Sequence, residues 1–325
     1  MLRLQGSAVS SGHVTLLFSI DDNHDDPLDQ GSRGVGLCIE GTNPVCEVSV
    51  SSEPGSGNVS GTGSVDIYRT TLEIVAASFP EVNSHDWYFV QNRSLPTQQG
   101  FGLSASASMA SALALLRAIG IDDEEARPMA FAVAHLVERS MSGGLGDVSA
   151  MWAGGVDLRR VAGSPTALTA NESARGVVDG WHLDIPMVVA WRATETKQTG
   201  SYIDDIEWKK AISAAGESEL KSLQQGNWNS ERWQEILTAS TRFAENSGLA
   251  SDSNRTQLLS CVNEAASNLE TKVSCHLCML GESVVILPAS LDYNLSESDR
   301  DQLVLFLESQ GMSATKVSLS EDCLR

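Results

Sequence analysis

The chain has 325 residues, more than a single hydrophobic core usually contains, so its length predicts two packed domains or one large elaborated domain. Hydrophobic residues make up 42% and charged residues 20%, a composition that excludes extensive disorder. The 42 acidic residues outnumber the 22 basic ones and give a net charge of −20. Because such a surface repels phosphate backbones and anionic lipid, we expect neither nucleic acid nor a membrane as a partner.

The apolar runs and the cysteines indicate where the protein resides. No apolar run reaches the roughly 18–20 residues that a membrane-spanning helix needs, and residues 1–13 lack the core of a signal peptide. The six cysteines do not have the spacing of a disulfide framework. We therefore expect a cytoplasmic protein with reduced thiols.

The N-terminal part is rich in strand signals. Apolar runs predict strands at residues 14–20, 34–40, 45–50 and 87–90. Residues 51–64 are rich in Gly and Ser, and we expect them to form a mobile loop. Residues 66–77 carry apolar side chains at helical spacing, which predicts a helix.

The centre of the chain is predicted to be helical. Residues 104–119 are rich in Ala and Leu, and Gly120 suits a left-handed residue that ends their helix. A second helix is expected from Asp122 to about Arg139, because Glu125 completes a start that resembles a capping box. The glycine-rich turn SGGLGD follows, and a third helix begins after it.

From about residue 185 strands and amphipathic helices alternate. Strands are predicted at 186–191, 273–280, 283–287 and 315–319, and helices at 204–223, 230–246, 254–269 and 296–310. Gly281 and Glu282 lie between two apolar runs and predict a tight hairpin turn. This order favours an α+β fold with antiparallel sheets. We divide the chain into an N-terminal domain, residues 1–183, and a C-terminal α+β domain, residues 184–325.

The first candidate for chemistry is the segment PTQQGFGLSASAS at residues 96–108. A helix N-terminus offers unpaired N–H groups and a partial positive charge, and glycine lets a phosphate approach the backbone. Gly100 and Gly102 are therefore candidate phosphate-binding residues, and Ser104 offers a hydroxyl to phosphate or Mg²⁺. The alternative is a loop that only caps a tightly packed helix. No G-x-x-x-x-G-K-[ST] motif occurs, which excludes a P-loop NTPase.

A second candidate set consists of His135, Glu138 and Asp147. His135 and Glu138 are three residues apart on one helix, and the glycine turn can return Asp147 to the same place. Of two carboxylates near a phosphate site, one can hold Mg²⁺ and the other can accept a substrate hydroxyl proton. The alternative is a solvated helix end, with Asp147 capping the next helix.

Two adjacent arginines, Arg159 and Arg160, follow the carboxylates in a chain with only six lysines, all in its C-terminal half. Arginine forks carboxylates and phosphates, so we expect one of the two to contact substrate. The other reading is a pair of solvated surface arginines.

The Cys275-x-x-Cys278 pair lacks the second pair that a zinc site needs, and we expect both cysteines to be packing residues on opposite faces of a strand.

Several of these segments resemble the GHMP kinase superfamily. PTQQGFGLSASAS resembles its phosphate motif, with one extra residue in the loop, and AHLVERSMSGGLGD resembles its segment of Glu, glycine turn and Asp. More narrowly, GSRGVG, HLVERSMSGGLGDVSA, GGVDLRR and MLGESV resemble, in the same order, segments of the archaeal pantoate kinase family. Two features depart from the superfamily pattern: its basic residue before the first strand corresponds only to His13, and the turn at Gly281 replaces a glycine-rich third motif.

The resemblance implies the two-domain GHMP kinase fold, α+β with mixed or antiparallel sheets and a ferredoxin-like C-terminal part. It implies a kinase of archaeal coenzyme A biosynthesis that uses ATP and Mg²⁺ to phosphorylate (R)-pantoate to 4-phosphopantoate, often as a homodimer. The alternatives are a GHMP kinase for another hydroxy acid, mevalonate-like or homoserine-like, and a catalytically silent ligand-binding member of the fold.

The resemblance also implies roles for individual residues. Asp147 corresponds to the catalytic aspartate, Glu138 to the Mg²⁺ ligand, and Ser104 to the loop hydroxyl near phosphate and Mg²⁺. The nucleotide-binding residues it implies are Gly100, Gly102, Ser104, Ala105 and Ser106. The residues it implies around pantoate are Ser32, His135 and Arg159.

Overall fold

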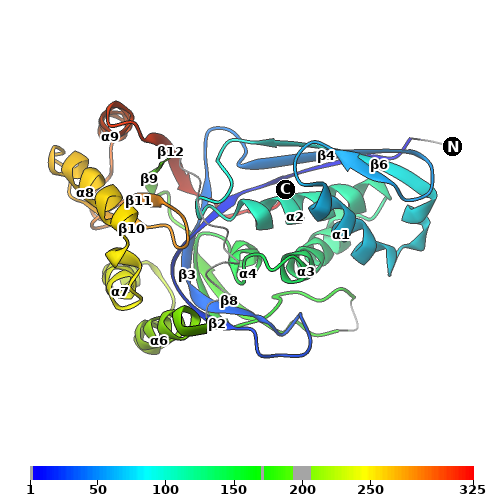
Figure 1. Ribbon diagram of the computed structural model, residues 1–325, viewed down its shortest axis with the longest axis horizontal. Coiled ribbons are helices and arrows are strands. Elements are labelled where there is room, and N and C mark those ends of the chain that lie inside the picture. Colours follow the sequence, from blue (N-terminus) through cyan, green and yellow to red (C-terminus); the bar gives the residue numbers. More distant parts are fainter. Residues whose placement is uncertain (1–2, 170–171, 193–205) are drawn as a thin grey trace.

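Two β-sheets form the framework of the molecule, and helices cover them (Figure 1). They belong to a computed structural model that describes residues 3–169, 172–192 and 206–325. The smaller sheet lies on the right in Figure 1 with the N-terminus, and the helices of the C-terminal part lie on the left. The α+β class predicted from the order of elements is confirmed.

The smaller sheet has the strand order β1-β4-β6-β5, in which only β5 and β6 run parallel. Its strands are β1 (Gln5–Ser10), β4 (Cys46–Pro54), β5 (Val59–Gly61) and β6 (His85–Arg93). Three helices and a 3₁₀ turn accompany it: α1 (Val65–Ala76), η1 (Pro80–Ser84), α2 (Leu103–Ala118) and α3 (Asp123–Ser140). The alanines of α2 are buried and bring it close to both its neighbouring helix and the sheet, and together they form one hydrophobic core.

The larger sheet has the order β10-β11-β9-β12-β3-β7-β8, with β2 paired to β3. Its strands are β2 (Gly12–Asp21), β3 (Gly31–Glu40), β7 (Val156–Val161), β8 (Val177–Trp181), β9 (Pro186–Trp191), β10 (Val273–Leu277), β11 (Ser283–Pro288) and β12 (Ser313–Leu319). The other helical elements are α4 (Asp147–Ala153), α6 (Ile206–Leu223), η2 (Ser230–Arg232), α7 (Trp233–Asn246), η3 (Leu249–Ser251), α8 (Ser253–Ser267) and α9 (Glu297–Ser309). The helices from α6 onward share the second hydrophobic core with this sheet.

The C-terminal part repeats the β-α-β-β-α-β pattern of ferredoxin-like folds. Strands β9, β10, β11 and β12 follow that pattern in the chain and lie in the antiparallel order β12-β9-β11-β10. The predicted ferredoxin-like part is therefore confirmed. Since β12 also pairs with β3, the larger sheet continues across residue 183, and the division into domains 1–183 and 184–325 stays a prediction.

Most predicted helices occur within two residues of their expected bounds. Gly120 ends α2 with a φ of 89°, and Asp122 caps α3 by accepting a hydrogen bond from the Glu125 amide, as expected. The helix predicted at 230–246 begins as η2 and continues as α7. Residues 204 and 205 of the helix predicted at 204–223 lie outside the described residues.

Two predictions about loops were wrong. Residues 51–64 were expected to form a mobile loop, but β4 extends to Pro54 and β5 adds a further strand. The reason is pairing: β4 continues in register with β6 from Cys46 opposite Arg93 to Pro54 opposite His85, which overrides a local composition rich in Gly and Ser. The turn expected at Gly281 and Glu282 alone is a longer connection from 278 to 282.

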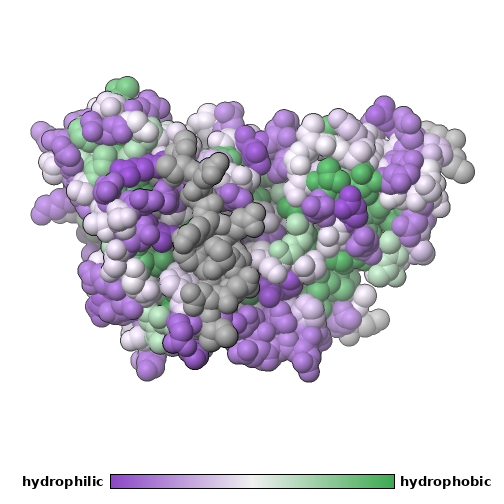
Figure 2. All heavy atoms as spheres, in the orientation of Figure 1, coloured by the Kyte–Doolittle hydropathy of each residue, from purple (hydrophilic) through white to green (hydrophobic). Residues whose placement is uncertain are grey.

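The surface agrees with the acidic composition. Figure 2 shows polar side chains over most of one face, with apolar ones gathered where α1 and α3 lie in Figure 1. Among the helices described, none is long and apolar enough to cross a membrane.

Candidate active site

The glycine-rich segment forms the expected loop at the start of α2. Gly100 and Gly102 have φ angles of 75° and 64°, a region that only glycine adopts readily, and Gly102 caps the helix. A Cβ added at Gly100 would lie 2.9 Å from the Cys278 carbonyl oxygen, so both conformation and space require glycine there. The loop therefore leaves the N–H groups of the first helical turn without a side-chain cap, as an anion site needs.

The connection between β10 and β11 supports this loop from behind. The Ser283 hydroxyl donates to the Gln99 carbonyl oxygen, and a Cβ added at Gly281 would lie 2.7 Å from the Gly100 nitrogen. Buried Arg255 donates its Nε to the Gly281 carbonyl oxygen at 3.2 Å. The segment MLGESV therefore supports the shape of the glycine loop.

The first turn of α2 is also anchored from within. Ser106 donates its hydroxyl to the Ser11 carbonyl oxygen at 2.6 Å and to the Gly102 carbonyl oxygen at 3.0 Å, and both Ala105 and Ser106 are fully buried. These contacts give the Ser106 side chain a structural role. The predicted nucleotide contacts of Ala105 and Ser106 stay predictions.

Glu138 of α3 faces the start of α2. Its Oε1 accepts hydrogen bonds from the hydroxyls of Ser104 at 2.7 Å and Ser108 at 3.0 Å, and its Oε2 accepts one from the Gly144 amide at 2.9 Å. The residue is 1% exposed, and burial raises the pKa of the carboxyl against the opposing effect of these hydrogen bonds. Ser104 and Glu138, predicted separately, thus lie in direct contact.

The glycine turn returns the chain to this place, as predicted. A Cβ added at Gly143 would lie 2.6 Å from Glu138 Oε2, and one added at Gly144 would lie 2.7 Å from Asp147 Oδ2. The two carboxylates therefore lie against the same glycine turn, Glu138 at Gly143 and Asp147 at Gly144.

Asp147 opens α4 and keeps 23% of its side chain exposed. Its Oδ1 lies 2.7 Å from Nδ1 of His13, a residue of β2 that is completely buried. Burial alone would raise the pKa of Asp147, but the hydrogen bond and charge of His13 outweigh it and lower the pKa. Asp147 is therefore an ionised carboxylate with one oxygen held in place.

His13 has a second carboxylate partner. Its Nε2 lies 2.8 Å from Oδ2 of Asp157, a residue of β7 with no exposed surface. Burial by itself lowers the pKa of His13, but the two carboxylates together outweigh it and raise the pKa to about 9. At neutral pH the ring is an imidazolium between two aspartates.

Arg159 lies on β7 two residues after Asp157 and continues the line of charged side chains formed by Asp147, His13 and Asp157. It is 1% exposed, its Nε lies 3.3 Å from Asp157 Oδ1, and its Nε and Nη2 have no well-aligned hydrogen bond among the residues described. A Cβ added at Gly146 would overlap both the Ser32 hydroxyl and the Arg159 guanidinium, which places these two polar groups against the turn before Asp147. The structure thus brings Ser32, Arg159 and Asp147 together.

Arg160 does not join them. Its Nε pairs with Asp179 of β8, and its Nη1 donates to the Gln224 carbonyl oxygen at 2.7 Å. Neighbours on a strand point to opposite faces, so only one of the two arginines can face the carboxylates. That residue is Arg159.

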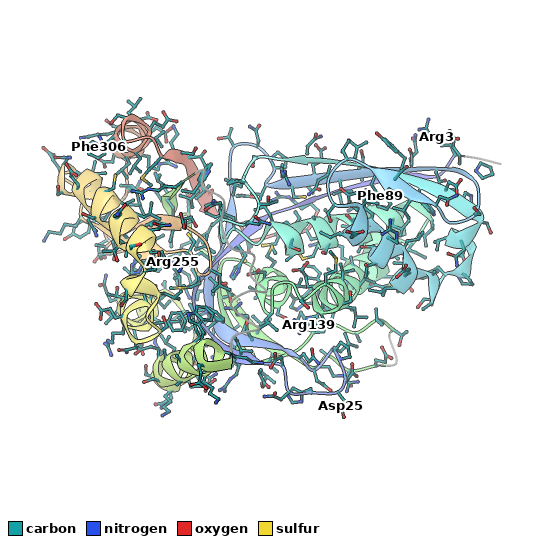
Figure 3. All side chains as sticks on the ribbon, viewed as in Figure 1. Arg3, Asp25, Phe89, Arg139, Arg255 and Phe306 are labelled. Carbon is teal, nitrogen blue, oxygen red and sulfur yellow. The ribbon has the colours of Figure 1, made fainter. Side chains whose placement is uncertain are left out.

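His135 lies one helical turn from Glu138 but faces a different neighbour. Its Nε2 lies 3.1 Å from the Pro27 carbonyl oxygen, and burial lowers its pKa to about 4, so the ring is neutral. Arg139, one turn further on, donates its Nε to Gln30 Oε1 at 3.0 Å, at the loop that carries Asp25 (Figure 3). Both side chains hold the loop between β2 and β3, which leads directly to Ser32.

Two residues of the site were not predicted. His13 was noted only as the basic residue before the first strand, and Asp157 was not predicted at all. Asp157 lies two residues before Arg159, and alternate residues of a strand share a face, so the spacing D-x-R in GGVDLRR was a usable signal.

The C-x-x-C pair behaves as packing: both thiols are free, and Cys278 is fully buried beyond the end of β10.

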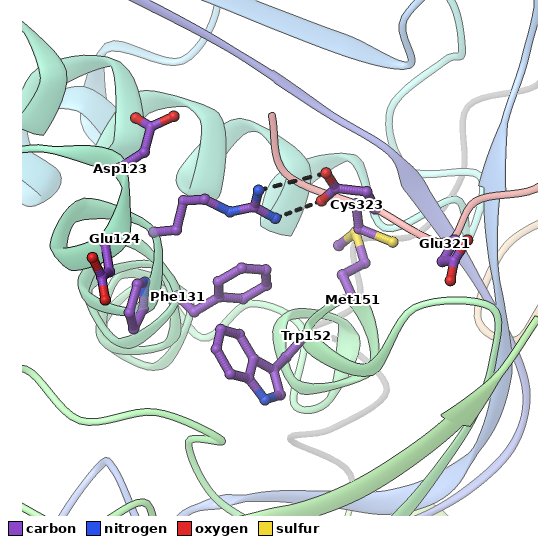
Figure 4. Close-up of a pocket in the computed structure, with 10 residues that line it drawn as sticks. Asp123, Glu124, Phe131, Met151, Trp152, Glu321 and Cys323 are labelled. Carbon is purple, nitrogen blue, oxygen red and sulfur yellow. Dashed lines mark hydrogen bonds and ion pairs between the residues drawn. The ribbon is translucent and has the colours of Figure 1, made fainter.

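A cavity of about 450 Å³ lies elsewhere on the surface, between the N-terminal half of α3, α4 and the C-terminal segment (Figure 4). Phe131 and Trp152 line it together with an ion pair between Arg127 and Asp322 at 2.5 Å. It shares no lining residue with the candidate site.

Comparison with known proteins agrees with this geometry. The family model for the GHMP kinases N terminal domain matches residues 68–155, which include the glycine loop, Glu138 and Asp147. Residues 68–155 therefore carry a GHMP kinase N-terminal domain. A pantoate kinase of Methanospirillum hungatei is 27% identical over 289 residues, covering 85% of this chain and 87% of the relative. A pantoate kinase of Thermococcus kodakarensis is 27% identical over 247 residues, covering 73% and 74%.

Solved structures of GHMP kinase type share the whole fold. A structure described as a phosphotransferase related to the CoA biosynthesis pathway superposes with a TM-score of 0.75 at 21% identity, over 99% of this chain and 98% of that chain. A mevalonate diphosphate decarboxylase from Staphylococcus aureus superposes with a TM-score of 0.66 at 12% identity, over 100% and 98%. These likenesses show that the GHMP kinase fold extends over both parts of the chain.

Proposed function

We propose that this GHMP kinase transfers the γ-phosphoryl group of ATP to the 4-hydroxyl of (R)-pantoate and releases ADP and 4-phosphopantoate, a step of archaeal coenzyme A biosynthesis. The relatives named pantoate kinase and the structural neighbour related to CoA biosynthesis support this acceptor. The observation that carries the proposal is the buried guanidinium of Arg159, beside Ser32 and the turn before Asp147, with two nitrogens that lack an aligned hydrogen bond among the described residues.

The charge of the chain makes Arg159 informative. Pantoate carries one carboxylate, and a protein of net charge −20 needs a dedicated cation to hold it. A buried arginine whose ion pair with Asp157 leaves Nη2 without an aligned hydrogen bond among the described residues is costly unless a ligand satisfies it, and a carboxylate matches its planar fork. The neighbouring Ser32 hydroxyl is placed to bind a second oxygen of the acceptor. Direct contact of His135 with pantoate is also proposed, although its Nε2 already bonds the Pro27 carbonyl.

The phosphates of ATP, which GHMP kinases use as phosphate donor, are assigned to the start of α2. There the unpaired N–H groups and the helix dipole favour negative charge, and Gly100 and Gly102 allow close approach. The Ser104 hydroxyl lies beside them and contacts Glu138. The donor is therefore assigned to the glycine loop beside Ser104 and Glu138, and the acceptor to Asp147, Ser32 and Arg159.

Ser104 and Glu138 also fit a magnesium ion. Mg²⁺ prefers oxygen ligands and is commonly bound by one or two carboxylates together with substrate phosphates. Among the described residues no group of three or more His, Cys, Asp or Glu side chains could hold a metal, so the substrate phosphates would supply the remaining ligands. When bound there, Mg²⁺ would neutralise phosphate charge.

Asp147 performs the proton step. Its partly exposed carboxylate accepts a hydrogen bond from the 4-hydroxyl and takes the proton as the oxygen–phosphorus bond forms and the bond to the β-phosphate oxygen breaks. His13 holds the other side of this carboxylate and keeps it ionised. Catalysis otherwise depends on alignment of donor and acceptor, which the loop and Arg159 provide.

A panel of acceptors tests the proposal. The purified protein with ATP and Mg²⁺ is given (R)-pantoate, mevalonate or homoserine, and ADP release is measured together with the mass of the phosphorylated product. We expect turnover with pantoate well above the other two acceptors. A preference for mevalonate or homoserine would assign another hydroxy acid, and no turnover with any of them would favour a silent member of the fold.

Matched variants separate the site from the rest of the protein. Asp147→Asn is expected to lose most turnover, whereas Asp179→Asn, which changes a half-exposed aspartate on β8, is expected to keep it. Equal activity of the two variants would contradict the role of Asp147. A homodimer, a cytoplasmic location and the absence of nucleic-acid binding remain proposals.

A further inference from the structure

Four charged side chains form a continuous row through the interior of the site. Asp147 Oδ1 lies 2.7 Å from His13 Nδ1, His13 Nε2 lies 2.8 Å from Asp157 Oδ2, and Asp157 Oδ1 lies 3.3 Å from Arg159 Nε. The last three are at most 1% exposed, and only Asp147 reaches the surface of the site. We call this row the charged chain. Its two ends are the residues assigned above to the hydroxyl and to the carboxylate of the acceptor.

The hydrogen-bond chemistry of the charged chain determines where its protons are. Both ring nitrogens of His13 lie against carboxylate oxygens. A neutral imidazole has only one N–H donor, so its other nitrogen would direct a lone pair at the lone pair of a carboxylate oxygen. His13 therefore donates from both nitrogens as an imidazolium, and Asp157 balances the positive charge. With Asp147, Asp157 and Arg159 ionised, the charged chain is neutral as a whole, which a buried row of charges requires.

The surrounding strands are built to admit this row. Gly36 and Gly34 of β3 lie opposite Asp157 and Arg159 of β7. A Cβ added at Gly36 would lie 2.6 Å from His13 Cε1, and one added at Gly34 would overlap the Arg159 guanidinium. The motif GSRGVG therefore makes room for the two cations of the charged chain.

We propose that Asp157 is a positioning residue that couples the two ends of the acceptor site: one of its oxygens keeps His13 protonated and aligned on Asp147, while the other orients Arg159. It touches neither ATP nor pantoate in this assignment and acts only through its two cationic neighbours. The proposal rests on the proposed function for the identity of the acceptor, but the coupling itself can be tested without it.

The coupling predicts how activity depends on pH. Among the described residues, the titratable or charged groups beside His13 are Asp147 of α4, Asp157 of β7 with Arg159 beyond it, and Cys38, which lies opposite His13 on β3. Burial raises the pKa of Cys38 well above its usual value, so this thiol is neutral. Because the pKa of His13 is raised to about 9, its proton is lost only as the pH rises through that value, and activity should fall there.

The test compares the wild-type enzyme with Asp157→Asn, His13→Gln and the double variant. We expect Asp157→Asn to lower kcat by about 10- to 150-fold, the loss of one charge-assisted hydrogen bond, and to move the alkaline fall in kcat to lower pH. Since Asp157 acts on the proton step through His13, the double variant should have a kcat no lower than that of His13→Gln alone. The control Asp179→Asn removes an aspartate from the neighbouring strand β8 and should leave the pH profile unchanged.

Two further measurements separate coupling from folding and from the choice of acceptor. Circular dichroism and ATP affinity by calorimetry show whether Asp157→Asn is folded. A titration of His13 by side-chain NMR needs no acceptor, so it still tests the coupling if pantoate proves not to be the substrate. We expect the pKa of His13 to fall in folded Asp157→Asn.

The proposal is overturned if folded Asp157→Asn leaves both the His13 titration and the alkaline limb in place, or if its kcat effect multiplies with that of His13→Gln. If Asp157→Asn does not fold, the titration of His13 in the wild-type protein decides the question. A His13 ring that is neutral at about pH 8 in the wild-type protein contradicts the proposal.

Discussion

Replacing Gly36 by alanine tests whether the close packing around His13 is needed for both stability and activity. A Cβ at this position would lie 2.6 Å from His13 Cε1 and 2.6 Å from the Val14 carbonyl oxygen, closer than side-chain atoms approach in proteins. Gly36 is not among the glycines with positive φ, so alanine would not strain the backbone there. Any effect must therefore come from crowding, which forces either the ring or strand β2 to move.

The size of the effect depends on whether the His13 ring or strand β2 moves. Overpacking of a dense interior costs about 1–3 kcal/mol. If the ring is displaced, buried Asp157 loses a charged partner, and breaking a buried ion pair costs about 3–5 kcal/mol. We therefore expect Gly36→Ala to lower the free energy of unfolding by about 1–5 kcal/mol. We also expect kcat to fall by about 10²-fold or more, since Asp147 is no longer aligned, while ATP affinity changes little.

Denaturant unfolding and steady-state kinetics measure both effects, and Gly41→Ala is the matched control. Gly41 follows β3, and a Cβ there would lie 3.5 Å from its nearest neighbour, an ordinary contact. The control should therefore be close to wild type in stability and in kcat. Equal behaviour of Gly36→Ala and Gly41→Ala would refute the argument that the glycine makes room for His13.

Three further outcomes follow from the site. Asp147→Asn and Glu138→Gln should each lower kcat by about 10²–10⁴-fold while circular dichroism shows an intact fold, and near-normal turnover of either would remove its assigned role. Gly100→Ala should weaken ATP binding by about 5–30-fold in calorimetry and pantoate binding less, because the loop relaxes from the left-handed conformation; an unchanged ATP affinity would separate the loop from the nucleotide. Arg159→Lys should raise the KM for pantoate by about 10- to 150-fold and the KM for ATP much less, with Arg160→Lys as control; a pantoate defect in the control alone would contradict the assignment.

Local signals predicted much of the fold. Helices α2 and α3 could be read from capping residues and apolar spacing, since these signals act within a few residues of each other. The extension of β4 to Pro54 could not, because its cause is pairing with β6, which lies far along the chain. Strand β8 was not predicted, since its residues Val177–Trp181 have weak alternation and depend on β7 for pairing.

The carboxylates of the site were predictable for a related reason. Glu138 and Asp147 are joined by a glycine turn, so their approach is a local property of one short segment. The contact of Glu138 with Ser104 required only that α2 and α3 pack side by side, which consecutive helices usually do. The interpretation of GSRGVG was less complete, because nothing in the motif itself indicates what its glycines accommodate.

The missing information is a register between distant strands. In β3 Gly34 and Gly36 are two residues apart, and in β7 so are Asp157 and Arg159, so each pattern alone is only a period of two. Pairing places Gly36 opposite Asp157 and Gly34 opposite Arg159, and only then does the absence of side chains on one strand match the large charged groups beside it. A strand with alternating glycines therefore predicts bulky or charged side chains opposite it without saying which. The D-x-R spacing places Asp157 and Arg159 on one face of their strand, but the contact of Asp157 with His13 of β2 becomes recognisable only once the register of the sheet is known.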